Sequence, residues 1–351
     1  MKLAPAVFLL CFSVAPLCAQ NDFDQLMADG HYKRARVAIE ARYKDAPNDP
    51  ETLRRLSRVR QLWGNLDEAY KLAERAVALA PKDAEAHYQL AETAGQKAEK
   101  ASMIHQMGLG RQFKKEIDLV LQLDAKHTGA MRGLMVFYLE APGVIGGDKA
   151  KARMMAEQIA RLDPVEGAQA QIDLARRLKQ EIRPEELLRK ATSARPESYE
   201  GHLQLGTYLA NQKNLADGER EAREAIRLHP GRVTAYGLLA AIQVHQEHWN
   251  DLGTTLTQAE KAVPDNLLPY FRAANNCLTR KVELGRAEGY FRKYLTMEPE
   301  PGSPGVAAVR WRLGLVLEAM GRKADAIKEI EASVAMDGNN PQVKADLKRL
   351  R

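Results

Sequence analysis

The sequence contains few of the residues that cross-link or fill a compact secreted domain. Only three of its 351 residues are cysteines, and aromatic residues make up 6%. Cys11 and Cys18 lie near the N-terminus, so Cys277 is alone in the rest of the chain. We therefore expect no internal disulfide bond, a fold held by packing, and a small buried thiol at Cys277.

An excess of one charge is also lacking. The chain has 52 basic and 46 acidic residues, which gives a formal net charge of +6. That balance is mild for this length, and nucleic acid is not an expected partner.

A long apolar run is missing outside the first residues. Residues 1–19 begin with the basic Lys2, continue with an apolar stretch from Val7 to Val14, and end at Leu17-Cys18-Ala19. This pattern predicts a secretory signal peptide cleaved near Ala19/Gln20, and hence a periplasmic or secreted protein. The run is short of the roughly 20 residues that cross a bilayer, so an uncleaved anchor is the less favoured alternative and no integral membrane span is expected in the mature chain.

What the sequence does have is a repeat with a period near 34 residues. Prolines after helical stretches recur with spacings of 34, 83, 32, 34, 34 and 35 residues. The long gap holds two units, and Ala125 divides it. Nine units result, ending near Pro47, Pro81, Ala125, Pro164, Pro196, Pro230, Pro264, Pro299 and Gly338.

Each unit also repeats a pattern of small residues. A leucine followed by a small residue occupies the first half, as in Leu205-Gly206 and Leu313-Gly314. A second small residue precedes the terminal proline by twelve positions: Ala35, Ala69, Ala152, Gly218, Ala287 and Ala326. Small residues at fixed positions allow two antiparallel helices to approach closely, and we expect the proline to end the second helix.

The spacing and these positions resemble the tetratricopeptide repeat, and "LQLGTYLANQKNLADGEREAREAIRLHP" is a close match. The resemblance implies an all-α, right-handed superhelix (an α-solenoid) of about nine helix-turn-helix units over residues 20–340, with a capping helix at 341–351. Phe113, Pro184 and Leu252 stand where a small residue is expected, so the third, fifth and seventh units should be distorted.

The stretch "APGVIGGDKAKA", residues 141–152, has the glycines and lysine of a phosphate-binding loop. However, Gly147 and Lys149 are not adjacent, no Ser or Thr follows, and the preceding segment is helical in context. We expect a widened turn inside the fourth unit, with Asp148 as the N-cap of the next helix. The turn, together with an extension at 95–115, resembles a group of exported bacterial tetratricopeptide proteins, and such insertions often lie on a binding face.

No catalytic or metal-binding constellation is apparent. His245 and His248 share one helical turn but lack further ligands at a suitable spacing. Acidic residues such as Glu219 have basic neighbours at helical spacing, which is typical of a solvated face. We therefore expect no enzyme activity, no cofactor and no metal.

The resemblance implies that the first helix of each unit lines the concave groove. The matching positions carry the candidate partner-binding residues Arg54, Arg58, Gln61, Tyr88, Arg132, Asn211, His245, Phe271, Asn275 and Trp311. Arg54 and Arg58 resemble half of a carboxylate clamp, which predicts an acidic or C-terminal segment as the partner there. A solvated helix face is the alternative for the two arginines, and ordinary packing is the alternative for Trp311.

The sequence thus predicts a non-catalytic scaffold outside the cytoplasm that holds a protein or peptide in its groove. Two alternatives remain open: an assembly factor of an envelope complex, and a small-molecule-binding periplasmic protein. The sequence does not indicate an oligomeric state.

Overall fold

The structure is a computed structural model that describes residues 17–351, with side chains from Phe23 onward. This range forms nineteen α-helices and one short 3-10 helix, and no strand occurs within it. Most of the predicted leader, residues 1–19, lies outside the described residues.

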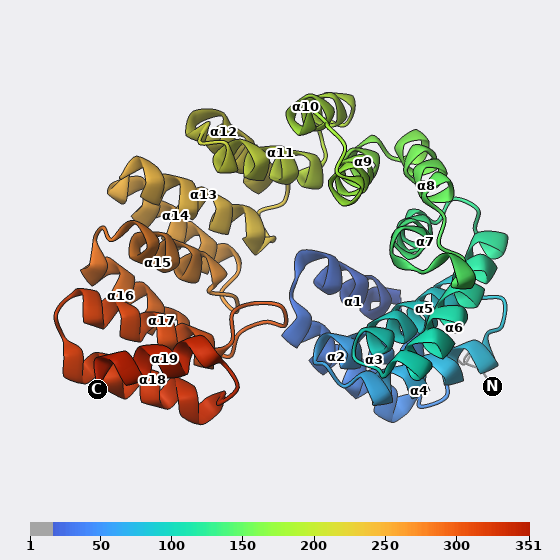
Figure 1. The fold of residues 1–351 in the computed structure, drawn as a ribbon, viewed down its shortest axis with the longest axis horizontal. Coiled ribbons are helices and arrows are strands. Elements are labelled where there is room, and N and C mark those ends of the chain that lie inside the picture. The colour runs from blue at the N-terminus through green and yellow to red at the C-terminus, as the bar shows by residue number, and fades with distance from the viewer. Residues whose placement is uncertain (1–16) are drawn as a thin grey trace, which may run out of the picture.

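Eighteen of the helices form nine consecutive pairs, and one helix follows them at the C-terminal end (Figure 1). The pairs are α1 (Leu17–Asp29) with α2 (Tyr32–Asp45), α3 (Pro50–Leu62) with α4 (Leu66–Leu79), α5 (Ala84–Glu99) with α6 (Met103–Leu123), α7 (Thr128–Glu140) with α8 (Lys149–Leu162), α9 (Pro164–Leu178) with α10 (Pro184–Ala194), α11 (Tyr199–Asn211) with α12 (Leu215–Leu228), α13 (Val233–Gln246) with α14 (Trp249–Ala262), α15 (Leu268–Arg280) with α16 (Leu284–Tyr294), and α17 (Val306–Ala319) with α18 (Lys323–Met336). The final helix is α19 (Pro341–Leu350), and a 3-10 turn, η1 (Gly143–Ile145), follows α7. The all-α superhelix predicted from the repeat is confirmed.

Helix starts follow from capping residues. Asp49 accepts a hydrogen bond from the Thr52 amide at 3.0 Å, and Pro50 takes the first helical position of α3. Asp163 caps α9 in the same way, with Pro164 at its first position. As expected from the repeat, α8 ends at Leu162, just before Pro164; Pro164 also begins α9, because a proline at the first helical position forfeits no intrahelical hydrogen bond.

Small residues lie where the helices of a pair touch. The residues predicted at this contact are all buried: Ala35, Ala69, Ala152, Gly218, Ala287 and Ala326. A Cβ atom built on Gly206 would lie 3.2 Å from the carbonyl oxygen of Gly218, and one on Gly314 would lie 2.5 Å from Cγ1 of Ile330. The paired helices therefore approach to a separation at which even one methyl group is crowded.

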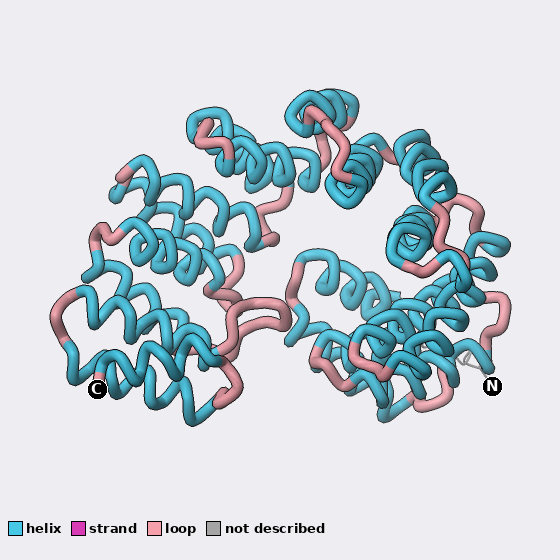
Figure 2. Tube along the Cα trace, in the orientation of Figure 1, coloured by secondary structure: helices cyan, strands magenta, loops and turns pink. Residues whose placement is uncertain are grey.

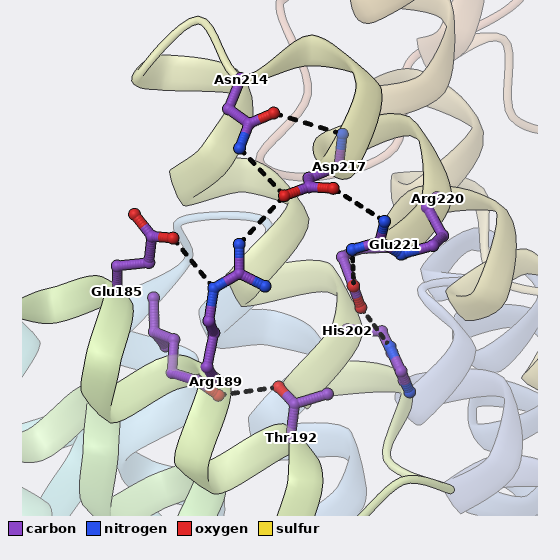
Figure 3. A network of polar contacts seen from close by, with 9 residues as sticks. Glu185, Arg189, Thr192, His202, Asn214, Asp217, Arg220 and Glu221 are labelled. Atoms are coloured by element: carbon purple, nitrogen blue, oxygen red, sulfur yellow. Dashed lines mark hydrogen bonds and ion pairs between the residues drawn. The ribbon is translucent and has the colours of Figure 1, made fainter.

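A buried histidine–glutamate pair occurs in two of the units. Nδ1 of His87 lies 2.6 Å from the Glu116 carboxylate, and Nε2 lies 3.1 Å from the carbonyl oxygen of Pro81. His202 makes the matching contacts, at 2.7 Å to Glu221 (Figure 3) and 2.9 Å to a proline carbonyl. Each histidine thereby ties the first helix of its unit to the second helix and to the preceding turn.

The C-terminal helix covers the end of the stack. Val343 and Leu350 of α19 are buried in the apolar cluster that extends back to α13. The indole nitrogen of Trp311 donates a hydrogen bond to Asp346 at 3.0 Å, which fixes α19 against α17.

The first unit also reaches the turns that follow the seventh and eighth units, and this contact closes the superhelix into a ring (Figures 1 and 2). The Lys33 side chain donates hydrogen bonds to the backbone carbonyls of Asp265 at 3.0 Å and Glu298 at 2.6 Å. The Lys33 amide donates to the Glu300 carboxylate at 2.9 Å, and Arg34 donates to the Asp265 carboxylate at 2.8 Å. We call these contacts the clasp.

Several groups of the clasp are withdrawn from water. His31 and Glu300 are 6% and 4% exposed. Burial raises the pKa of Glu300, although Lys33 acts in the opposite direction. Burial also opposes ionisation of Asp265, but contacts with His31 and Arg34 outweigh it and lower the pKa of that carboxyl group. At neutral pH ionised Asp265 strengthens the clasp, whereas ionised Glu300 carries a desolvation cost.

A glycine pair tests the close approach of the helices. Gly314→Ala should destabilise the fold by about 1–3 kcal/mol, because the new methyl group overlaps Ile330. Gly253→Ala is the control: this helical glycine has open space around it, so alanine should stabilise by about 0.5–1 kcal/mol through helix propensity. The free energy of unfolding in urea measures both, and a stabilising Gly314→Ala would contradict the steric account.

A lysine pair tests the clasp. Lys33→Ala should increase the radius of gyration measured by solution X-ray scattering, and more so at high salt, because screened ion pairs hold less firmly. Lys97→Ala is the control, since its side chain is similarly exposed (25% against 23%) but its bond to Asp67 joins neighbouring units. If Lys33→Ala scatters like the unchanged protein at every salt concentration, the clasp does not hold the ring closed.

Candidate binding groove

The first helices of the middle units line the inside of the ring. Figure 1 shows α7, α9 and α11 on the inner side and α8, α10 and α12 on the outer side. All ten predicted groove residues lie on the first helix of their unit.

A hollow lies where the two irregular segments of the sequence meet. The hollow has a volume of about 820 Å³ and lies between α5, the start of α6, α7 and η1. Its apolar lining includes Tyr88, Phe113, Phe137, Met103, Met107 and Val136. The extension at 95–115 and the turn after α7 together form it, and its size is typical of a ligand site.

Phe113 stands at a position where the repeat normally has a small residue, and two glycines make room for it. A Cβ atom on Gly95 would lie 3.3 Å from the Phe113 ring, and one on Gly133 would lie 3.2 Å from it. The ring instead stacks on Phe137, with centroids 6.0 Å apart. In this unit the second helix, which usually has a small residue at this position, has a large one, and the first helices that face it have glycine.

The turn after α7 has the local structure expected from the sequence. Asp148 accepts hydrogen bonds from the amides of Ala150 and Lys151 and so caps α8. Gly146 has a φ of 110°, a conformation that favours glycine. A Cβ atom on Gly147 would lie 1.8 Å from the carbonyl oxygen of Ala141, so the turn folds tightly onto the end of α7. The segment is therefore a widened turn between the two helices α7 and α8, as expected, and it does not follow a strand as a phosphate-binding loop would.

A strip of polar residues extends from the hollow toward α3. The Tyr88 ring packs against His127, with centroids 4.4 Å apart. Nε2 of His127 lies 3.3 Å from the Glu85 carboxylate, and this contact raises the pKa of His127 and lowers that of Glu85. Arg54 lies 3.9 Å from the other oxygen of Glu85. Arg58 is exposed and makes no hydrogen bond or ion pair with another described residue.

Four of the predicted groove residues therefore lie in one region: Arg54, Arg58, Tyr88 and Arg132. Arg132 lines the hollow, but its guanidinium group is held by Asp173 at 2.8 Å and Glu166 at 3.7 Å. Burial of Tyr88, together with the nearby Glu92, raises the pKa of the phenol.

The remaining predicted residues lie elsewhere, and two of them are buried. Gln61 accepts a hydrogen bond from Gln89 at 2.7 Å inside the α3–α5 contact. Phe271 packs on Phe291 and Tyr294 in the apolar core. The expectation that Gln61 and Phe271 face the groove is corrected by this burial, since neither side chain offers surface to a partner.

Four other predicted residues are distant from the hollow. Asn211 is exposed at the end of α11, and His245 contacts Asn276 at 3.1 Å. Asn275 accepts a hydrogen bond from Arg312, and Trp311 is tied to α19. The residues that sequence reasoning missed are Phe113 and the glycines that face it. The departure of Phe113 from the repeat was the signal for them.

Two other features are absent from the described residues. Between residues 17 and 351, no group of three or more His, Cys, Asp or Glu side chains is arranged to hold a metal ion. Within the same range, no helix combines the length and the apolar character needed to span a bilayer.

Comparisons with known proteins add similarities of overall shape. No family profile and no curated protein matches this chain. The chain is similar to the crystal structure of yeast Tom70, with 13% identity over 95% of this chain and 87% of that one, at a TM-score of 0.47. It is also similar to a thermophilic TPR protein in Thermus thermophilus, with 16% identity over 66% of this chain and all of that one, at a TM-score of 0.39.

Proposed function

We propose that this protein is a non-catalytic scaffold that holds a segment of a partner protein on the inner side of its ring, with the hollow between α5, α6 and α7 as the main contact. The observation that carries this proposal is the hollow itself, because two departures from the repeat converge to form it. Apolar concave sites with a few polar groups are where proteins generally bind ligands.

The apolar surface continues beyond the rim of the hollow. Met103 and Ile104 at the start of α6 are 78% and 77% exposed, and Val144 of η1 is 93% exposed. Exposed apolar side chains that adjoin a pocket favour contact with a protein segment over an enclosed small molecule. An assembly factor of an envelope complex could use the same surface, and the small-molecule reading is the less supported alternative.

An acidic or C-terminal segment at Arg54 and Arg58 is a second candidate for the partner contact. Arg58 favours it, because its guanidinium group is exposed and free of ion pairs with the described residues. Arg54 is less suited, since Glu85 lies beside it and its side chain is mostly buried. Under this alternative, Arg58→Ala would weaken partner binding more than changes in the hollow.

We further propose that the protein acts outside the cytoplasm. The support is the apolar leader with its acceptable cleavage site at Ala19, described from the sequence alone.

The leader predicts the N-terminus of the mature protein. Mass spectrometry of the exported chain should find that it begins at or within a residue or two of Gln20. The matched control is Ala19→Arg, which should block cleavage, so that the measured mass includes the leader. An intact Met1 on cytosolic protein would contradict the proposed compartment.

Photo-cross-linking tests the hollow in the cells that make the protein. A photoreactive amino acid in place of Val136 should form a discrete adduct. Met103→Glu with Met107→Glu should reduce it by about tenfold or more, because carboxylates would be buried against apolar partner groups.

The control for this test is Met320→Glu with Met336→Glu, whose methionines are also exposed, at 39% and 57% compared with 38% and 78% for Met107 and Met103. Both double variants should fold normally, as checked by circular dichroism and melting temperature. If no adduct forms, or if the adduct persists in the Met103→Glu, Met107→Glu variant, the proposal is wrong.

A further inference from the structure

Most carboxylates on the helices of this chain have a cationic partner. Figure 3 shows one example, in which Asp217 forms two ion pairs. Its partners are Arg189 of the neighbouring unit at 3.1 Å and Arg220 of its own helix at 2.7 Å. Arg223 pairs with Glu219 at 2.6 Å on the same helix. Such pairs satisfy the charges within the chain and leave little for a ligand.

Two carboxylates that line the hollow differ from this pattern. Glu92 and Glu99 form no ion pair with any residue in the described part of the chain, and Glu92 accepts only a hydrogen bond from the Tyr88 hydroxyl at 3.2 Å. They are seven residues apart on α5, so they share one helical face at an axial separation of about 10 Å. The wall of the hollow therefore carries two uncompensated negative charges in a row.

No basic side chain of the hollow's own lining is free to neutralise this row. Arg132, the basic residue that lines the hollow, is held by Asp173 and Glu166. Lys97 lies on α5 and Lys100 is the C-cap of that helix, but both line a second hollow toward α4, where Lys97 pairs with Asp67. Glu140, the third acidic residue of the lining, is already paired with Arg177.

Much of the remaining lining of the hollow is apolar. Phe113 and Phe137 lie against glycines, and Met107 reaches the rim from α6. A ligand that fits this lining needs both large apolar side chains and positive charges. An acidic ligand would place like charges beside Glu92 and Glu99, which is unfavourable in a partly desolvated site.

We propose that the hollow binds a cationic amphipathic segment of a partner protein, whose apolar side chains pack on Phe113 and Phe137 while its Lys or Arg residues pair with Glu92 and Glu99. This inference rests on the proposed function and adds the chemistry of the partner. Flexible methionines at such a rim can adapt to different apolar side chains.

A random peptide library displayed on phage tests the charge preference with the purified mature protein. Peptides recovered on the unchanged protein but lost on a Met103→Gln, Met107→Gln variant, which makes the lining polar without adding negative charge, are those that use the hollow. We expect these peptides to be rich in Lys, Arg and large apolar residues and poor in Asp and Glu. Synthetic copies should bind about threefold to tenfold more weakly to the Glu92→Gln, Glu99→Gln variant, with most of the loss at low salt.

Reversal of charge is the sharper arm of the experiment. Glu92→Lys with Glu99→Lys should recover peptides rich in Asp and Glu, which a purely structural role of the two glutamates would not produce. Glu219→Gln with Glu224→Gln is the matched control, because these glutamates are paired on the outer helix α12. The control should leave peptide binding unchanged.

The outcomes separate this inference from the proposed function. Hollow-dependent peptides without a basic bias, or with an acidic one, overturn the cationic partner and leave the hollow as a binding site. The absence of any peptide that depends on Met103 and Met107 counts against both. A basic bias that does not respond to the reversal at Glu92 and Glu99 overturns the assignment of these two residues.

Discussion

Steric contact between the two helices of each pair is the constraint on which the rest of the structure depends. Where Gly206 faces Gly218, and where Gly314 faces Ile330, the backbones are so close that an added methyl group has little or no room. Close approach lets each pair bury its apolar face on the next pair, so the core extends along the stack and no globular centre is needed. This explains how a chain with one cysteine in its repeats and few aromatic residues stays folded.

The candidate site arises where this constraint is relaxed. Phe113 replaces a small residue, and the space it needs is provided by Gly95 and Gly133 on the neighbouring first helices. The same region contains the longest helix, α6, and the widened turn after α7. Most helical carboxylates of the other units are paired, whereas this unit has the hollow of about 820 Å³ with two unpaired carboxylates in its lining. Function in repeat proteins is often located in such insertions.

The clasp gives the ring a second property, since a closed ring limits how a partner can reach the inner wall. Its groups are more than 200 residues apart in the sequence, for example Arg34 on α2 and Asp265 in the turn after α14, which are separated by 231 residues. The contacts combine a lysine bonded to backbone carbonyls with partly buried carboxylates. Because ion pairs weaken with salt, we expect the closed form of the ring to be less stable at high salt.

The sequence alone determined the fold class, the repeat length and the helix caps, because these depend on local patterns: small residues at fixed spacing, and capping groups such as Asp49 and Asp148 next to the helices that they start. It also marked the two irregular segments. It could not reveal that they meet around one hollow, nor that Gln61 and Phe271 are buried. Burial depends on how each helix is rotated against its neighbours, and a repeat alignment fixes that only approximately. The clasp and the unpaired state of Glu92 and Glu99 were decided by tertiary structure, because they depend on which distant side chains come within a few ångströms of each other.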